Sequence, residues 1–374
     1  MLVGSAWLLG SMLVSPENHV VPLPAGFQAR AVNIPGAGHL VAGWWVDAGN
    51  ESPVVLLLHG ARADRSSMES RAQLLLRHGF SVLLIDLQAH GETPGDAITL
   101  GYRESRDVVA ARDWIRGTAP GRRMGVIGCS LGGASVLLAP QPLGVDAVVL
   151  EAVYPRISQA VEDRIRIFLG PLAPVLAPLL LAQLQPRLHI SVSDLEPIRS
   201  IALLKTPVLV VAGSKDERTT LAESQELFER AAVPKLLWVV QGARHQDFLA
   251  YDRQGYEAHV LTFLIEALRP SRRINSACDK SQGNRAAESF LKHTDLSGGD
   301  LHSNAIESAQ ECHEGFGVIG AEYAADCKTA QRGGLDLNGR CGVSIELRRN
   351  RGERLPLEYE LASQPGSGRL RIDG

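Results

Sequence analysis

A serine in a glycine-rich string is the first residue that could do chemistry. The string Gly128-Cys129-Ser130-Leu131-Gly132-Gly133 has the pattern G-x-S-x-G and follows the apolar run Met124 to Ile127. At a junction between strand and helix, Gly128 and Gly132 permit a sharp turn that holds the serine exposed in a strained conformation. Because a serine hydroxyl is a weak nucleophile, it needs a base to take its proton and a carboxylate to orient that base. A glycine turn with an idle serine is the alternative interpretation.

Asp216 and His245 are the candidates for that carboxylate and that base. Asp216 lies just past the apolar run Val208 to Ala212, and His245 follows the last predicted strand. Functional loops gather at the carboxyl ends of open parallel sheets, where both residues are expected. A helix N-cap is the alternative role for Asp216, and a surface loop is the alternative for His245. Glu151, at the end of another predicted strand, is an alternative acid.

Two backbone N–H groups could stabilise the oxyanion that forms when a serine attacks a carbonyl. Leu131, directly after the serine, can supply one of them. Ala61 can supply the other, because Gly60 lets the backbone turn towards the substrate after the run Val54 to Leu58. A plain turn that ends the strand is the alternative interpretation of this loop.

The elements that must position these residues alternate along the chain. Short continuous apolar runs, typical of parallel strands buried on both faces, cover Val54 to Leu58, Val82 to Ile85, Met124 to Gly128, Ala147 to Leu150, Val208 to Ala212 and Leu236 to Val240. Apolar residues spaced by three and four predict helices over Ser66 to Arg77, Glu104 to Arg116, Leu131 to Leu138, Leu221 to Ala232 and Gly255 to Leu268. The sequence therefore predicts an α/β protein, with a doubly wound, mostly parallel sheet and helices on both faces.

Residues 28–270 form the predicted main domain, which begins with an antiparallel hairpin of Gln28 to Ile34 and Leu40 to Val46. Residues 1–27 are a lead-in that contains the apolar stretch Leu2 to Val14. This stretch is shorter than the roughly 20 residues that cross a bilayer, and it lacks the basic start of a secretory signal. It therefore predicts a docked helix or a truncated anchor.

Two further segments depart from the alternating pattern. Residues 155–200 are apolar, and Pro171, Pro174 and Pro178 break any single helix there, which favours an inserted helical cap over a membrane span. Residues 271–374 are rich in Gly, Ser, Asn and charge, with one weak strand candidate, and predict a C-terminal extension of low order.

Composition excludes several classes of function. Of 374 residues, 45% are hydrophobic and 21% charged, as in a soluble globular protein. With 38 basic and 41 acidic residues, no basic surplus is available to neutralise phosphates, so no nucleic-acid partner is expected. The five cysteines lack C-x-x-C spacing, and no G-x-G-x-x-G opens the first helix, so neither a metal nor another cofactor is expected.

These motifs together resemble an α/β-hydrolase from about residue 28 to residue 268. The match rests on His59-Gly60 after the first parallel strand, Asp86 with His90-Gly91 after the next, G-C-S-L-G-G, and the order Ser130, Asp216, His245. The chain is most similar to bacterial serine hydrolases related to the fermentation-respiration switch protein family. The resemblance implies an esterase or peptidase-like hydrolase, often tethered by an N-terminal hydrophobic segment.

We therefore expect a serine hydrolase that cleaves carboxylic esters of small molecules through an acyl-enzyme intermediate. Peptidase or thioesterase activity at the same triad is the runner-up, and a non-catalytic binding protein of this fold is a third possibility. If the apolar segment 165–184 covers the cleft, it is expected to line an acyl pocket or a hydrophobic leaving-group pocket. Helices that merely complete the core are the alternative interpretation of this segment. Peripheral membrane contact through the N-terminal segment is expected in a bacterial-type protein that is cytoplasmic or membrane-associated.

Residues near the motifs receive lesser roles. Asp86 and His90 are expected to tie down a loop, and Asp247 either supports His245 or is a solvated loop residue. A surface loop beside the site is expected to contain Arg62, Asp64 and Arg65.

Overall fold

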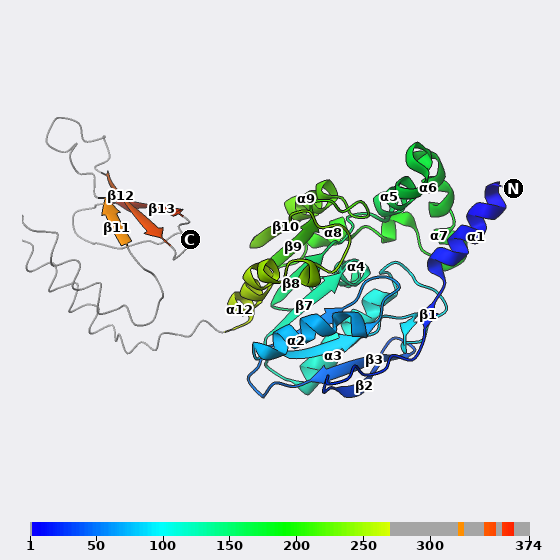
Figure 1. Ribbon diagram of the computed structural model, residues 1–374, viewed down its shortest axis with the longest axis horizontal. Coiled ribbons are helices and arrows are strands. Elements are labelled where there is room, and N and C mark those ends of the chain that lie inside the picture. Colours follow the sequence, from blue (N-terminus) through cyan, green and yellow to red (C-terminus); the bar gives the residue numbers. More distant parts are fainter. Residues whose placement is uncertain (1, 270–320, 325–339, 349–353, 363–374) are drawn as a thin grey trace, which may run out of the picture. The chain divides into compact units, whose positions relative to one another are not determined.

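An eight-stranded sheet is the centre of the unit Met1–Cys278 in the computed structural model, which describes residues 2–269, 321–324, 340–348 and 354–362 (Figure 1). The strand order is β10-β9-β8-β7-β4-β5-β3-β2. Six strands are parallel: β4 (Val54–Leu58), β5 (Ser81–Ile85), β7 (Met124–Cys129), β8 (Ala147–Glu151), β9 (Val208–Gly213) and β10 (Lys235–Val240). The hairpin β2 (Arg30–Pro35) and β3 (Leu40–Val46) adds two antiparallel strands, as predicted. A short separate pair joins β1 (Glu17–Asn18) to β6 (His90–Gly91).

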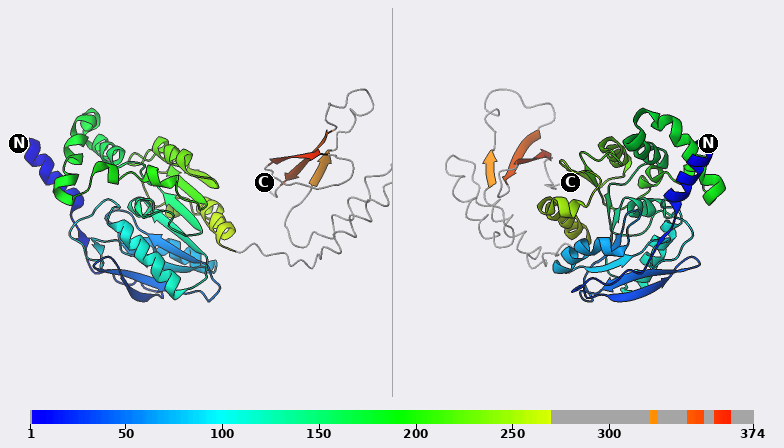
Figure 2. Two further views of the ribbon diagram at one scale, coloured as in Figure 1. Left: turned by 180° about the vertical axis from the view of Figure 1, so that it is seen from behind. Right: turned by 45° about the vertical axis from the view of Figure 1, so that its right-hand side comes forward.

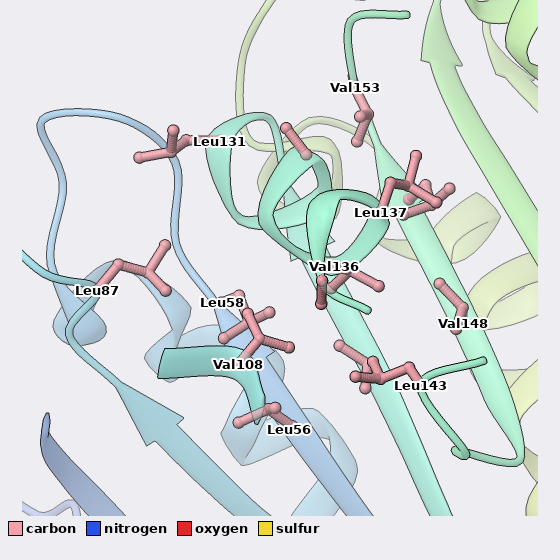
Figure 3. Packing of buried hydrophobic residues seen from close by; sticks show 14 of the residues in the cluster. Leu56, Leu58, Leu87, Val108, Leu131, Val136, Leu137, Leu143, Val148 and Val153 are labelled. Atoms are coloured by element: carbon pink, nitrogen blue, oxygen red, sulfur yellow. The ribbon is translucent and has the colours of Figure 1, made fainter. Parts of the chain in front are cut away.

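The parallel strands β4, β5, β7, β8 and β9 are buried on both faces, which explains why they appear as unbroken apolar runs. The same expectation was wrong for β10, because it is an edge strand with Leu236 54% exposed. In β4, Leu56 and Leu58 contribute to one core layer, while Val55 and Leu57 contribute to the other. Figure 3 shows Leu56 and Leu58 packed close to Val108 in the first of these layers. The period of two along each strand thus produces two separate hydrophobic layers.

Helices cover both faces, as predicted. The first layer receives α3 (Glu104–Thr118), α4 (Leu131–Leu138), α8 (Pro197–Ile201) and α9 (Leu221–Arg230). The second receives α2 (Glu69–Arg77) after the 3-10 turn Arg65–Met68, then α10 (Phe248–Tyr251), α11 (Arg253–Tyr256) and α12 (Thr262–Leu268). A π-helical turn, Glu257–Leu261, joins the last two helices. The architecture is the α/β-hydrolase fold that the resemblance implied.

The segment between β8 and β9 forms a helical cap. It contains α5 (Ile157–Leu169), the 3-10 turn Gly170–Leu172, α6 (Ala173–Leu181), α7 (Leu184–Leu188) and the 3-10 turn Val192–Asp194, and it ends with α8. The chain changes direction at Gly170, whose φ of 53° ends α5. Pro171 lies in the turn that follows, whereas Pro178 lies inside α6. The segment is therefore not a single helix, as the three prolines predicted, although Pro178 itself lies inside α6.

The N-terminal apolar stretch is a helix, α1 (Leu2–Val14), that docks on the cap. Arg187 Nη1 donates to Ser11 Oγ at 2.8 Å, and Gln183 Nε2 donates to the Ala6 carbonyl at 3.0 Å. The Arg187 guanidinium lies 3.8 Å from the centroid of the Trp7 ring. Figure 2 shows this blue helix beside the green helices of the cap in both views. The expectation of a docked helix is confirmed.

The second unit, Asp279–Gly374, is described only in part. Its described residues form a three-stranded antiparallel sheet of β11 (Ala321–Ala324), β12 (Arg340–Arg348) and β13 (Arg354–Ala362). The weak strand candidate Gly342 to Leu347 falls within β12. The other residues for which low order was expected lie outside the described part of the chain.

Candidate active site

Ser130 lies at a strained turn between β7 and α4. Its φ of 47° and ψ of −109° place a non-glycine residue in a region that costs about 1–3 kcal/mol. The flanking glycines are required by space: a Cβ on Gly128 would lie 2.6 Å from Gly133 Cα, and one on Gly132 would lie 2.6 Å from the Leu58 carbonyl oxygen. The Ser130 N–H donates to the Glu151 carbonyl at 2.8 Å. The turn therefore holds the serine at the carboxyl ends of the parallel strands, with 9% of the residue exposed.

Asp216 and His245 come together on the loops that follow β9 and β10. His245 Nδ1 lies 2.8 Å from Asp216 Oδ2, and the Asp216 side chain is fully buried. The other oxygen, Asp216 Oδ1, accepts from the N–H groups of Arg218 and Thr219 at 2.8 and 3.0 Å. A carboxyl group held in this way orients the imidazole with Nδ1 as donor, which leaves Nε2 to accept a proton.

The serine and the histidine follow strands whose carboxyl ends lie at the same end of the sheet. The carboxyl ends of β7, β9 and β10 lie there because all three strands are parallel. Within the described residues no hydrogen bond joins the Ser130 hydroxyl to His245, and such catalytic contacts often tighten only when substrate binds. The arrangement can transfer a proton from a serine to Nε2 once that contact forms.

The two predicted oxyanion donors flank the nucleophile. Leu131 is the first residue of α4, so its N–H has no acceptor within the helix. A Cβ on Gly60 would lie 3.7 Å from Ser130 Cβ, which places the loop containing Ala61 against the serine. In the described chain neither the Ala61 nor the Leu131 N–H donates to a protein acceptor. Both amides are therefore available to a substrate oxygen.

His59 fixes the direction of the Ala61 amide. The Leu87 N–H donates to His59 Nε2 at 3.0 Å, so the ring carries its proton on Nδ1 and donates it to the Gly60 carbonyl at 2.8 Å. Burial lowers the pKa of His59 to about 3, so the ring stays neutral. The carbonyl and the N–H of a trans peptide point in opposite directions, so the Ala61 N–H points away from His59.

Glu151, the alternative acid, is bound to other groups. Arg71 Nη2 donates to Glu151 Oε2 at 2.7 Å, and the Tyr256 hydroxyl donates to Oε1 at 2.6 Å. Asp247 also pairs with Arg71, through Nη1 at 3.0 Å, and it caps α10 by accepting from the Ala250 N–H. The structure therefore supports Asp216 rather than Glu151 as the partner of His245.

Some neighbouring residues differ from expectation. Asp86 does tie down a loop, because it accepts from the N–H groups of Arg65 and Glu92 at 2.7 and 2.8 Å. Arg65 was expected on the surface but is buried, where it pairs with Asp86 and Glu92. Arg71 and Tyr256 were missed. The only signal for Arg71 was its place on the buried stripe of α2, between Met68 and Leu75.

The cap does not present its large apolar side chains to the site as expected. Exposed residues of the cap include Ile167, Phe168, Leu169, Leu172, Val175 and Leu179. Its buried residues between 165 and 181 are Ile165 and the small Ala173 and Ala177. The acyl-pocket interpretation of segment 165–184 was therefore wrong for most of its large side chains, because the cap helices turn them to solvent.

Two carboxyl groups, one on the cap and one on the main domain, lie near each other. Burial, together with the charge of Asp163 on α5, raises the pKa of Glu223 on α9 to about 7. Asp163 also binds Arg166 of its own helix. Glu223 Oε2 accepts from the Thr220 N–H at 2.7 Å, whereas Oε1 is buried without a hydrogen-bond partner among the described residues. A proton on Glu223 therefore favours the folded chain.

Glu223→Gln is expected to flatten part of the pH dependence of stability. The folded-state pKa of about 7 exceeds the ordinary 4.5, so the folded chain holds the proton more tightly. This contribution is fully present below pH 4.5 and is lost as pH rises through 7. The free energy of unfolding is measured by urea titration at pH 5 and at pH 8. Relative to wild type, that of the variant should be about 1 kcal/mol more favourable to folding at pH 8 than at pH 5, a value that allows for solvent screening. Glu229→Gln, at an exposed site on the same helix, is the control and should show no such gain. An equal change in unfolding free energy between the two pH values for wild type and Glu223→Gln would contradict the raised pKa of Glu223.

Comparisons with known proteins agree with the fold described above. The model of a family described as the alpha/beta hydrolase family matches residues 55–258. The uncharacterized protein Rv2307c of Mycobacterium tuberculosis is 29% identical over 214 residues, which cover 56% of this chain and 69% of the relative. The uncharacterized protein YqkD of Bacillus subtilis is 23% identical over 243 residues, or 63% of this chain and 79% of the relative.

A solved structure shares the fold. The esterase Pf2001 of Pyrococcus furiosus superposes with a TM-score of 0.58 at 23% identity, covering 69% of this chain and 99% of its own. At this identity the likeness establishes the fold alone.

Proposed function

The chain belongs to the alpha/beta hydrolase family, and we propose that it is a serine hydrolase that cleaves carboxylic esters of small molecules. The observation that carries the proposal is the contact of 2.8 Å between His245 Nδ1 and the buried Asp216, on the same sheet edge as the strained Ser130. A surface histidine or a plain helix cap has no need of this arrangement. The esterase among the structural neighbours agrees with it.

The proposed reaction has two halves. Ser130 Oγ attacks the ester carbonyl while His245 Nε2 takes the hydroxyl proton, and the amides of Ala61 and Leu131 stabilise the oxyanion. When the tetrahedral intermediate collapses, the carbon–oxygen bond to the alcohol breaks, and His245 returns the proton to the alcohol. Water, deprotonated by the same nitrogen, then attacks the acyl-enzyme and releases the carboxylic acid and the free serine. Asp216 stabilises the imidazolium in each half.

A panel of acyl compounds tests the substrate class. p-Nitrophenyl esters from acetate to palmitate, the matching p-nitroanilides and acyl thioesters are to be compared by kcat/KM on the full chain. We expect the esters to be the best substrates, because amides are more stable and their amine must be protonated to leave. Higher kcat/KM for thioesters or anilides would assign the thioesterase or peptidase activity instead, and an inert but folded protein would favour a binding role.

We also propose that α1 and the cap contact a lipid surface. Exposed large apolar residues on α1 are Trp7, Leu8, Leu9, Met12 and Leu13, and the cap adds its six exposed apolar side chains between 167 and 179. Neither α1 nor α6 contains a charged residue, whereas Arg187 of the neighbouring α7 lies with its guanidinium against Trp7 of α1. By length and composition alone, Ile157–Leu188 could cross a membrane, and 22% of its most apolar window is buried. An uncharged apolar face beside a basic group fits anionic lipid.

Flotation with liposomes tests this contact. Full-length chain should float with vesicles of phosphatidylglycerol and phosphatidylcholine, and replacing Leu8, Leu9 and Phe168 with serine should lower the floated fraction at least fivefold. Val233→Ser is the matched control, because Val233 and Phe168 are both 81% exposed but Val233 lies outside the proposed face. Failure of the wild type to float, or equal flotation of all variants, would rule out the lipid contact.

A further inference from the structure

A buried arginine lies behind the candidate site and is not used by the proposed chemistry. Arg71 projects from α2 and is 3% exposed. It binds Glu151 with two nitrogens, Nε to Oε1 at 3.2 Å and Nη2 to Oε2 at 2.7 Å. The Tyr256 hydroxyl completes the carboxylate shell, and Arg71 lies 5.4 Å from the centroid of the Tyr256 ring. Arg71 of α2 and Tyr256 of α11 thus hold the Glu151 carboxylate in place.

Glu151 is in direct contact with the nucleophile turn. Its carbonyl accepts the Ser130 N–H at 2.8 Å, and β7 pairs Cys129 with Glu151 in the sheet. Cys129 Sγ lies 3.2 Å from Glu151 Oε2. Burial raises the pKa of the Cys129 thiol well above its usual value, so the thiol keeps its proton and donates. The glutamate that Arg71 holds therefore touches both residues that begin the turn.

The third nitrogen of Arg71 reaches the histidine loop. Nη1 donates to Asp247 Oδ2 at 3.0 Å, and Asp247 begins α10 two residues after His245. Asp247 is the half-exposed member of this set, with 37% of its side chain accessible. One guanidinium thus joins the nucleophile turn to the loop that carries the base, although the two are 115 residues apart in sequence, from 130 to 245.

Stability alone does not explain a buried charge cluster. Replacing a buried ion pair with apolar residues of similar volume is often neutral or stabilising, so such a pair is weak evidence for a role in stability. Catalytic geometry is more demanding, because a displacement of about 1 Å between reacting groups can lower a rate by about 100-fold. The planar guanidinium group of Arg71, with three nitrogens that donate in fixed directions, is suited to hold reacting groups at a set distance.

We propose that Arg71 is a positioning residue that holds His245 in reach of Ser130 through Glu151 and Asp247. The inference rests on the proposed function, since it assigns the distance between Ser130 and His245 to this cluster. Arg71 does not touch substrate. Its effect passes through the Glu151 backbone to the serine and through Asp247 to the histidine loop.

A double-mutant cycle on kcat tests the proposal. Arg71→Lys keeps a positive charge opposite Glu151 but cannot form all three bonds. Asp247→Ser keeps an N-cap for α10 but is too short to reach Arg71. Each single variant should lower kcat for p-nitrophenyl acetate about tenfold with KM within twofold of wild type. The double variant should be no slower than Arg71→Lys, because both changes break the same connection.

Active-site titration and thermal melts separate positioning from folding. Rates are expressed per titrated serine, so unfolded protein does not count, and the rate of fluorophosphonate labelling should fall in parallel with kcat. Arg122→Met is the matched control. Arg122 pairs with Asp47, its side chain is 8% exposed, and it lies just before β7, at the end of the strand opposite Ser130. Its loss should leave kcat within twofold of wild type. A lower Tm with unchanged kcat, or fully additive losses, would overturn the proposal. An inert wild type that is not labelled would instead refute the proposed function itself.

Discussion

Replacing Ser130 with alanine is expected to lower kcat for p-nitrophenyl ester hydrolysis by about 10⁴- to 10⁶-fold. The reason is the loss of the only atom that forms the acyl-enzyme, which leaves the oxyanion donors and binding alone to act. The free energy of unfolding should change little, because the substitution removes one oxygen atom and no contact in the core. Initial rates on protein of equal Tm measure the effect.

Ser135→Ala is the matched control for this prediction. Ser135 is a buried serine of α4, one turn beyond the nucleophile, and its hydroxyl donates to the Leu131 carbonyl within the helix. We expect its kcat to stay within twofold of wild type. Equal activity of wild type and Ser130→Ala would show that another group performs the hydrolysis.

Asp216→Asn is expected to lower kcat by about 10³- to 10⁴-fold, the second largest effect. The amide is nearly the same size, yet it cannot stabilise the imidazolium and can favour the wrong tautomer of His245. Because the Asp216 side chain is fully buried, no water replaces its charge beside Nδ1. The value of kcat at several pH values, measured with active-site-titrated protein, checks the loss.

Glu151→Gln is the comparison that assigns the acid. Glu151 contacts Arg71 and Tyr256 rather than His245, so its amide variant should lose only about tenfold, as expected of a positioning group. If Glu151→Gln lost several orders of magnitude and Asp216→Asn lost little, the catalytic acid would come from β8, and the roles of Asp216 and Glu151 would be exchanged.

Sequence patterns were sufficient for the sheet and for the residues at its edge. Strands such as β4 and β9 are buried on both faces and therefore appear as unbroken apolar runs that need no tertiary information. The string at 128–133 and the loops after β9 and β10 are local features as well. In this fold the loops after β9 and β10 are neighbours, so Asp216 and His245 could be predicted as partners before their contact was seen.

Side-chain direction and long-range pairing could not be read in the same way. Arg65 and Arg71 are charged residues that the local pattern places near a loop and on a helix, and their carboxylate partners lie 21 and 80 residues away. The cap showed apolar residues but not which of them face outward, since its helices are short and interrupted at Gly170. Both failures concern contacts between distant segments, which composition and spacing do not encode.

The most direct test of the central claim is to identify the residue that a fluorophosphonate modifies. Folded wild-type chain and the Ser130→Ala variant are treated with the probe, digested and mapped by mass spectrometry. We expect one adduct per chain, on the peptide that contains Ser130, with none in the variant and a rate of labelling that falls in Asp216→Asn. An adduct on another residue, or no adduct on folded wild-type protein, would contradict the claim that Ser130 is an activated nucleophile.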